Sequence, residues 1–325
     1  MLRFTLRRLL LIPLALILIN FLGFSFAYVI AQFQRSQMIY GSGQGQLDPV
    51  WPVYVEYAQQ ALKLDFGSMP IGVNEPIASA VAIATLNSLG LLGLAFTLSI
   101  VFGLVIGLSA VWVDPPKTAG WLALISTVGL AMPGFYVGTL FVGAMIMSTY
   151  GSDRQPFLPV AGFGFDQHLI LPVLALAIRP CVQVAQVAGS LLAGELGKRY
   201  VVAGRAFGQT WHAIRWDKAL RNVLAPIFLT IASSFRLLMA ELLLVEWLFS
   251  WPGLGRLLAL TLVPPRFSSI GGMLDTSVFF LDPPLVAALL VVFGLFFLLA
   301  DSISAGLARA SDPRLRLAEE EHFNG

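Results

Sequence analysis

The ionisable side chains that lie inside long apolar stretches of this sequence include Arg179, Arg236, Glu241 and Glu246. Charges at such positions usually face a bundle interior or a watery path and find partners, because hydrocarbon solvates them poorly. On a helix, Arg236 and Glu241 would lie about 140° apart, which is unfavourable for pairing with each other. Two interpretations stay open. Arg236 or Glu241 lines a translocation pathway, with Arg179 as the partner of Glu241, or these charges form structural pairs at a subunit interface.

Residues for enzymatic or metal chemistry are scarce in the chain. There is one cysteine, Cys181, and the three histidines, His168, His212 and His322, are widely scattered, which argues against a metal site. The sequence contains no G-x-x-x-x-G-K-[ST] loop, no H-E-x-x-H and no G-x-S-x-G motif. We therefore predict no catalytic residue, metal or cofactor in this chain. Uphill transport would need an ion gradient or another subunit.

The composition indicates which solvent surrounds the protein. Of 325 residues, 57% are hydrophobic and 12% are charged, whereas soluble domains have about 25% charged residues. So few charges cannot cover the surface of a soluble protein of this length. A soluble enzyme, a nucleic-acid-binding protein and a disordered protein are therefore poor interpretations. The lipid bilayer is the expected surroundings.

Six apolar runs are long enough to cross a bilayer, which takes about 20 helical residues. They lie near residues 9–31, 86–111, 119–147, 169–192, 223–249 and 285–304. Each must be helical, because an open strand leaves unpaired backbone groups in lipid. The first run is too long for a cleavable signal and lacks a small-residue cleavage site, so we interpret it as an uncleaved signal anchor. The predicted fold is an all-α polytopic membrane protein with about six transmembrane helices.

The positions of lysine and arginine predict the orientation. One side would carry 13 of the 20 basic residues: Arg3, Arg7, Arg8, Lys117, Lys198, Arg199, Arg205, Arg215, Lys218, Arg221, Arg309, Arg314 and Arg316. The other side would carry five: Arg35, Lys63, Arg154, Arg256 and Arg266. The richer side should be cytoplasmic, and an even number of spans then places both termini there.

This orientation divides the chain into four parts. Residues 1–31 form an N-terminal cytoplasmic tip and the first span, and residues 32–85 form an external loop with a short amphipathic helix near 53–64. Residues 86–308 form the membrane core, with a cytoplasmic loop near 193–222. Residues 309–325 form a cytoplasmic tail. The segment 257–284 is left without a predicted structure.

The cytoplasmic loop carries six of the 13 inside charges and has a pattern of its own. Helix formers continue to Phe207, Gly208 follows, and a second helical stretch begins near Trp211, which predicts two short helices with a bend between them. A simpler interpretation is a positively charged loop whose only role is to orient the protein.

Residues 200–208 (YVVAGRAFG) and 219–226 (ALRNVLAP) resemble the coupling loop of permease subunits in ATP-binding-cassette (ABC) importers. More narrowly, the chain resembles the first permease of the dipeptide/oligopeptide/nickel group. Further matches follow in order along the chain, at 2–9 (LRFTLRRL), 64–68 (LDFGS), 131–135 (AMPGF), 157–162 (FLPVAG), 245–256 (VEWLFSWPGLGR) and 312–316 (DPRLR). This chain has Val202-Ala203-Gly204 where the family often has a Glu-Ala-Ala-like triplet, which weakens any inference of a salt bridge to the ATPase.

The resemblance implies a type I ABC importer permease fold in a bacterial or archaeal cytoplasmic (inner) membrane. It also implies a second homologous permease, an extracytoplasmic solute-binding protein and two ATPase subunits or domains, which would bind ATP and Mg. The residues it places in the ATPase-coupling loop are Ala203, Arg205, Ala206 and Gly208. It suggests that Trp251, Pro252 and Gly253 lie near an external gate. An interfacial belt is the other interpretation of Trp251.

A self-sufficient secondary transporter or channel is the alternative function. It would normally show an inverted repeat or two interrupted helices in corresponding positions, and neither is evident. The cargo of similar permeases includes short peptides, nickel complexes, glutathione-like molecules and sugars. The sequence predicts a short peptide or a similar small solute without selecting one.

Overall fold

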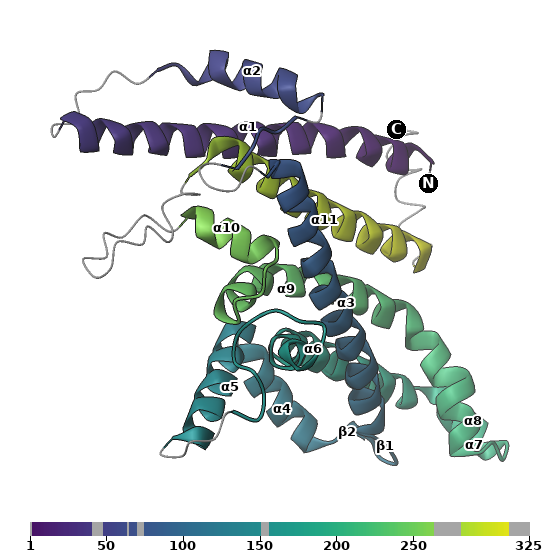
Figure 1. The fold of residues 1–325 in the computed structure, drawn as a ribbon. Coiled ribbons are helices and arrows are strands. Elements are labelled where there is room, and N and C mark those ends of the chain that lie inside the picture. Colours follow the sequence, from purple (N-terminus) through teal and green to yellow (C-terminus); the bar gives the residue numbers. More distant parts are fainter. Residues whose placement is uncertain are drawn as a thin grey trace. The chain divides into compact units, whose positions relative to one another are not determined.

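The computed structural model describes residues 2–40, 48–63, 65–69, 75–150, 156–262 and 281–311. Its elements, in chain order, are α1 (Leu2–Tyr40), α2 (Val50–Ala61), α3 (Ile77–Ser109), β1 (Val111–Val113), β2 (Pro116–Thr118), α4 (Gly120–Ala131), α5 (Gly134–Thr149), η1 (Gln167–Leu169), α6 (Ile170–Leu196), α7 (Arg199–Ala206), α8 (Trp211–Ala213), η2 (Ile214–Ala219), α9 (Leu220–Leu248), α10 (Leu254–Leu262) and α11 (Pro283–Ser311). Figure 1 shows this helical architecture.

The membrane-spanning helices agree with the predicted all-α polytopic fold. Five helices in the described part of the chain are long and apolar enough to cross a membrane, and the pair α4–α5 makes a sixth when it is counted as one span. The predicted run 119–147 is therefore not a straight helix, because α4 and α5 are bent by 94°. Pro133 lacks an N–H and disfavours helical geometry at Met132, which is extended, so the helix ends there.

Helices occupy both ends of the segment 32–85, which the sequence predicts to be an external loop. Helix α1 continues to Tyr40, and no proline or glycine interrupts it after residue 31 until Gly41. Helix α3 begins at Ile77, directly after Pro76. The short helix predicted near 53–64 is present as α2. Within the undefined segment 257–284, residues 263–280 lie outside the described part of the chain.

The chain divides into two compact units. Unit 1 comprises Met1–Leu89 and Ser250–Leu298. Here α2 lies along α1 (Figure 1), where Tyr54 and Tyr57 pack on Phe24. The amide of Asn20 hydrogen-bonds both tyrosine hydroxyls at 3.2 Å. An amide inside an apolar span is thus hydrogen-bonded by the helix that covers it, which offsets the cost of its partial burial.

Unit 2 comprises Gly90–Phe249 and Leu299–Gly325 and contains the predicted cytoplasmic loop. Helix α6 packs against α4, α5 and α9, and Figure 1 shows it nearly end-on between its neighbours. Helix α3 approaches α6 closely at Gly107, where an added Cβ would meet the backbone of Ala185. The antiparallel pair β1–β2, which the sequence did not predict, joins α3 to α4.

Candidate functional site

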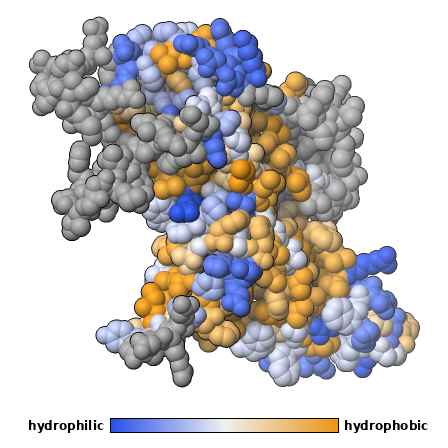
Figure 2. Space-filling model, in the orientation of Figure 1, coloured by the Kyte–Doolittle hydropathy of each residue, from blue (hydrophilic) through white to orange (hydrophobic). Residues whose placement is uncertain are grey.

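Helix α7 has one face bound to the protein and one face open. Val201 and Gly204 are buried, one turn apart, and a Cβ on Gly204 would meet Gln209 Oε1 at 3.0 Å. The residues Val202, Ala203, Arg205, Ala206 and Phe207 are exposed. Figure 2 shows hydrophilic residues gathered where α7 and α8 lie in Figure 1, beside apolar surface. No described residue covers this open face, so it is available to a partner protein.

The bend after α7 lies at Gly208, as the sequence predicts. Gly208 has φ +78°, a left-handed conformation that glycine adopts without a Cβ penalty. Its N–H donates to the carbonyl of Arg205 at 2.9 Å, and the N–H of Gln209 donates to Gly204 at 3.0 Å. Phe207 stands at this turn with 86% of its surface exposed. The turn therefore presents an aromatic side chain at the end of the open face.

The second helix of the loop is not short, which corrects the sequence interpretation. A single helical segment runs from Trp211 to Leu248, through α8, η2 and α9. Thr210 caps its start, since its Oγ1 accepts a hydrogen bond from Ala213 N. The second half of the loop and the membrane span thus form one continuous helical rod, Trp211–Leu248, because the chain contains no helix-breaking residue between Trp211 and Pro226.

Arg205 closes the turn between the two helices. Its Nη1 donates to the carbonyl of Gln209 at 2.6 Å, and its guanidinium lies 4.7 Å from the centroid of the Trp211 ring. Cation–π contacts of this kind hold a planar guanidinium in place. The other coupling residues that the resemblance singled out, Ala203, Ala206 and Gly208, are exposed beside it. The structure thus brings all four to one end of α7.

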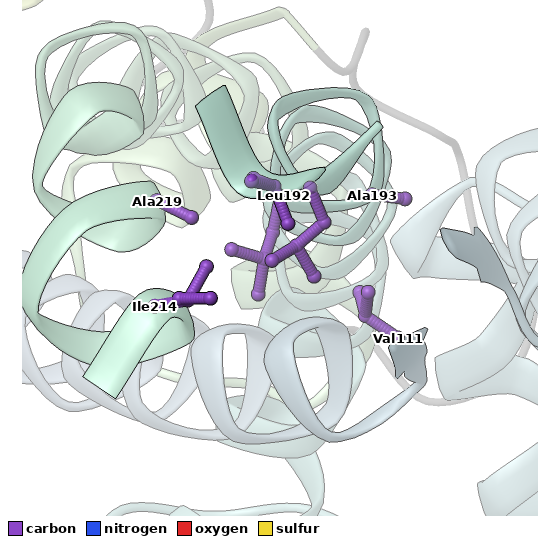
Figure 3. Close-up of a cluster of buried hydrophobic side chains, with 7 residues drawn as sticks. Val111, Leu192, Ala193, Ile214 and Ala219 are labelled. Carbon is purple, nitrogen blue, oxygen red and sulfur yellow. The ribbon is translucent and has the colours of Figure 1, made fainter. Parts of the chain in front are cut away.

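A compact apolar cluster lies beneath α7 and the start of the long rod. Its buried members are Val111, Leu192, Ala193, Leu196, Val201, Ile214 and Ala219. Figure 3 shows this cluster, with Val111 from β1, Leu192 and Ala193 from α6, and Ile214 and Ala219 from η2 labelled. Their burial holds the loop against the helices of unit 2.

Glu195, in the last turn of α6, was missed by sequence reasoning. It is 6% exposed, and its Oε1 accepts hydrogen bonds from the hydroxyl of Tyr200 at 3.1 Å and from Asn222 Nδ2 at 2.8 Å. Its Oε2 pairs with Lys198 Nζ at 2.5 Å. Burial and the negative charge of Glu195 raise the pKa of Tyr200 to about 12. The spacing of Glu195 and Lys198 was the available signal.

Arg215, within the π-helical turn η2, holds a second set of contacts. Its guanidinium donates to the carbonyls of Leu108 and Val111, the latter at 3.5 Å, and lies 5.2 Å from the Trp216 ring. Leu108 belongs to the last turn of α3, whose carbonyls have no partner within the helix. Arg215 therefore caps α3 and ties it to the loop.

Glu241 lies at the break between α4 and α5. It is 7% exposed, and its Oε1 accepts a hydrogen bond from Arg179 Nη1 at 2.7 Å, the pairing that the sequence suggested. Its Oε2 accepts from the backbone N–H of Gly134 at 3.0 Å. A carboxylate at a helix N-terminus satisfies a free N–H and interacts favourably with the helix dipole. Glu241 thus joins α9, α6 and α5.

Arg236 has a different partner from Glu241. Its Nη1 binds Asp301 Oδ1 at 3.0 Å, so α9 is joined to α11 within unit 2. The two side chains are 38% and 51% exposed. Sequence reasoning missed Asp301, although an acid inside the apolar run 285–304 was a visible signal. A half-exposed ion pair in a membrane protein needs a polar or protein-covered environment.

Trp251, Pro252 and Gly253 pack within unit 1. The Trp251 ring is fully buried and its Nε1 donates to the carbonyl of Asn87 at 3.1 Å. Asn87 Nδ2 in turn donates to the carbonyl of Pro252 at 2.9 Å. A buried ring does not belong to an interfacial belt, so that interpretation of Trp251 is wrong. The suggested gate role stays a prediction.

No group of three or more His, Cys, Asp or Glu residues suited to hold a metal ion occurs among the residues whose placement is described.

Comparison with known proteins places these features in a family. The family described as "Binding-protein-dependent transport system inner membrane component" matches residues 99–317. The chain is 28% identical over 333 residues to the "Glutathione transport system permease protein GsiC" of Salmonella choleraesuis (strain SC-B67), covering 97% of this chain and 99% of the relative. The protein of that name from Escherichia coli (strain K12) is 27% identical over 273 residues, 82% of this chain and 80% of the relative. These matches favour an importer permease over a self-sufficient transporter or channel.

Proposed function

We propose that this chain forms half of the translocation pathway for a short peptide or a similar small solute. The chain belongs to the family of binding-protein-dependent transport system inner membrane components. It is a multi-pass permease component of an ABC importer. The relatives are named for glutathione transport. A peptide-like solute about as large as glutathione is therefore the cargo to test first.

We propose that a second homologous permease forms the other half of the pathway. Two cytoplasmic ATPase subunits or domains would bind ATP and Mg, and an extracytoplasmic solute-binding protein would deliver the cargo. The excess of basic residues in the loop 193–222 supports a cytoplasmic location for it and for both termini. The membrane would be the cytoplasmic membrane of a bacterium or an archaeon.

The observation that carries the ATPase contact is the open face of α7 with its glycine turn. Ala203 and Ala206 contribute only small side chains to this face, and the exposed ring of Phe207 lies at its end. Aromatic anchors of this kind contribute strongly to protein interfaces when a partner buries them. The continuous helix from Trp211 to Leu248 would carry a displacement at the docked face into the membrane.

Pathway roles for Arg179, Arg236 and Glu241 are part of this proposal. Arg179, Arg236 and Asp301 are each partly exposed, which supports polar surroundings for each of the two ion pairs. An aqueous pathway and a second permease would both meet that requirement.

The test uses the complete transporter, in which this chain is assembled with its own ATPases, second permease and binding protein. Radiolabelled glutathione and trialanine are the probes, in vesicles with ATP enclosed on the cytoplasmic side. We expect ATP-dependent uptake of at least one probe by the complex and no ATP hydrolysis by the isolated chain. ATP hydrolysis by the chain alone, or uptake by the chain driven only by an ion gradient, would overturn the proposal.

Gly208→Val tests the coupling face within the same assembly. A β-branched side chain is strained at φ +78°, so we expect loss of the ATPases on purification or hydrolysis without uptake, with membrane insertion intact. Gly194→Val is the matched control, because neither glycine has an atom within 4 Å of an added Cβ and Gly194 lies in a regular helix. Normal ATPase association and uptake in Gly208→Val would refute the coupling role.

A further inference from the structure

Helix α7 has only eight residues and connects to its neighbours through short turns at both ends. A short helix held by turns swings when it is pushed, unless side chains fix its direction. The apolar cluster beneath it supplies adhesion, but hydrophobic contact is non-directional. Hydrogen bonds to charged groups are directional and weaken steeply with angle. The direction of α7 and of the first turns of the rod therefore depends on their polar contacts.

The first fixed point is the carboxylate of Glu195. Its contacts come from the residue before α7 (Lys198), from the first turn of α7 (Tyr200) and from α9 (Asn222), while Glu195 itself belongs to α6. One buried group therefore joins three helices, α6, α7 and α9, at the start of α7. Its removal would leave the donors of Tyr200, which is partly buried, and of Asn222 without their acceptor, and the directional tie between the three helices would be lost.

The second fixed point is the guanidinium of Arg215. It joins η2 to the last turn of α3 through Leu108 and to β1 through Val111. Since η2 continues into α9, this contact sets the direction of the rod relative to α3. The planar fork of arginine reaches both carbonyls, whereas the single ammonium of lysine would reach one of them.

We propose that Glu195 and Arg215 are positioning residues that fasten the ATPase-docking face to α3, α6 and α9, so that a displacement of α7 moves these helices together. This inference rests on the proposed function. Neither residue lies on the open face, so neither is needed for ATPase binding itself. Their loss should separate ATP hydrolysis from transport while the ATPases stay bound.

The experiment measures solute imported per ATP hydrolysed by the complete transporter in vesicles, together with the amount of ATPase that co-purifies. Glu195→Gln keeps the size of the side chain but removes its charge and one acceptor. Arg215→Lys keeps the charge but removes the fork. For each we expect ATPase association as in wild type, hydrolysis within about twofold, and about tenfold less import per ATP. Glu56→Gln, at an exposed position on α2, is the control and should keep the wild-type ratio.

Milder variants cover the case in which Glu195→Gln does not assemble. Tyr200→Phe and Asn222→Ala each remove one donor to Glu195, and each should lower the import per ATP about two- to threefold. A wild-type ratio in the assembled Glu195 and Arg215 variants, or in both milder variants, would overturn this inference but leave ATPase docking intact. Loss of the ATPases from these variants would also overturn it, because the residues would then shape the docking face. Failure of wild type to import either probe with ATP would instead count against the proposed function.

Discussion

The backbone N–H of Gly134 donates a hydrogen bond to the carboxylate of Glu241, 107 residues away in the sequence, at 3.0 Å. This contact lies where the bent pair α4–α5 changes direction, directly after Pro133. The same carboxylate binds Arg179. Proline thus ends one helix, and a buried acid from α9 receives the first N–H of the next.

Gly134→Ala should disturb this contact, because the added Cβ would collide with the Glu241 carboxylate and lie 2.9 Å from the carbonyl of Ala175. Overpacking of this kind typically destabilises a protein by about 1–3 kcal/mol. We expect a lower midpoint of thermal unfolding in detergent. Gly143→Ala, in the same helix with no atom within 4 Å of the new Cβ, should unfold at or above the wild-type temperature. Equal midpoints for the two variants would contradict the packing at Gly134.

Glu241→Gln and Arg236→Met should differ in their effect on stability. Breaking a buried ion pair costs about 3–5 kcal/mol, and Glu241 is buried beside Arg179. Exposed pairs contribute about 0–1 kcal/mol, and Arg236 with Asp301 is half-exposed. Thermal unfolding of the two purified variants measures this difference. Uptake by the assembled variants tests the pathway role separately, and unchanged uptake in both would refute that role.

The phenol of Tyr200 should lose its proton at a higher pH than an ordinary tyrosine does. Its pKa is raised to about 12 by burial and by the charge of Glu195, so the neutral phenol is the form that the fold favours. The stabilisation is complete below the ordinary pKa of 10 and is lost as the pH rises from 10 to 12. Absorbance of tyrosinate near 295 nm, compared between wild type and Tyr200→Phe, should show a component with a midpoint near 12. If the component that Tyr200→Phe removes had its midpoint near pH 10 instead, Tyr200 would not be in contact with Glu195.

Gly208→Ala and Gly194→Ala should change stability in opposite directions. Both positions have room for a Cβ, but only Gly208 has a positive φ. Alanine in the left-handed region costs about 1–2 kcal/mol, whereas replacing a helix-interior glycine by alanine gains about 1 kcal/mol. Thermal unfolding of both variants decides this, and a stabilised Gly208→Ala would contradict the turn geometry.

Hydropathy predicted the membrane helices well because burial in lipid requires long apolar runs with internally paired backbones. The ends of the helices were less predictable. Helix α1 extends to Tyr40 through polar residues, since its backbone bonds do not depend on hydropathy. The bend at Pro133 has a local cause, but the carboxylate that receives the N–H of Gly134 at this bend comes from Glu241, which is remote in the sequence.

The candidate site was predictable where local rules decide it. Gly208 marks the turn because glycine adopts positive φ without strain, and this signal is visible in the sequence alone. The partners of charged groups were harder to predict, since they depend on which helix faces meet. Arg236 binds Asp301 and Glu195 binds Asn222, and neither pair follows from spacing along one helix.

The π-helical turn η2 has a consequence for how this segment tolerates insertions and deletions. Its hydrogen bonds close around one residue more than those of an α-helix. Loss of one residue between Ile214 and Ala219 would convert it to an ordinary α-turn and leave the helix unbroken. Because the wide turn absorbs its extra residue locally, the helical parts before and after η2 would keep their relative direction. The side chains within the turn, Arg215 among them, would instead be repositioned, so a one-residue deletion here would break the contacts of Arg215 without rotating the transmembrane part of the helix.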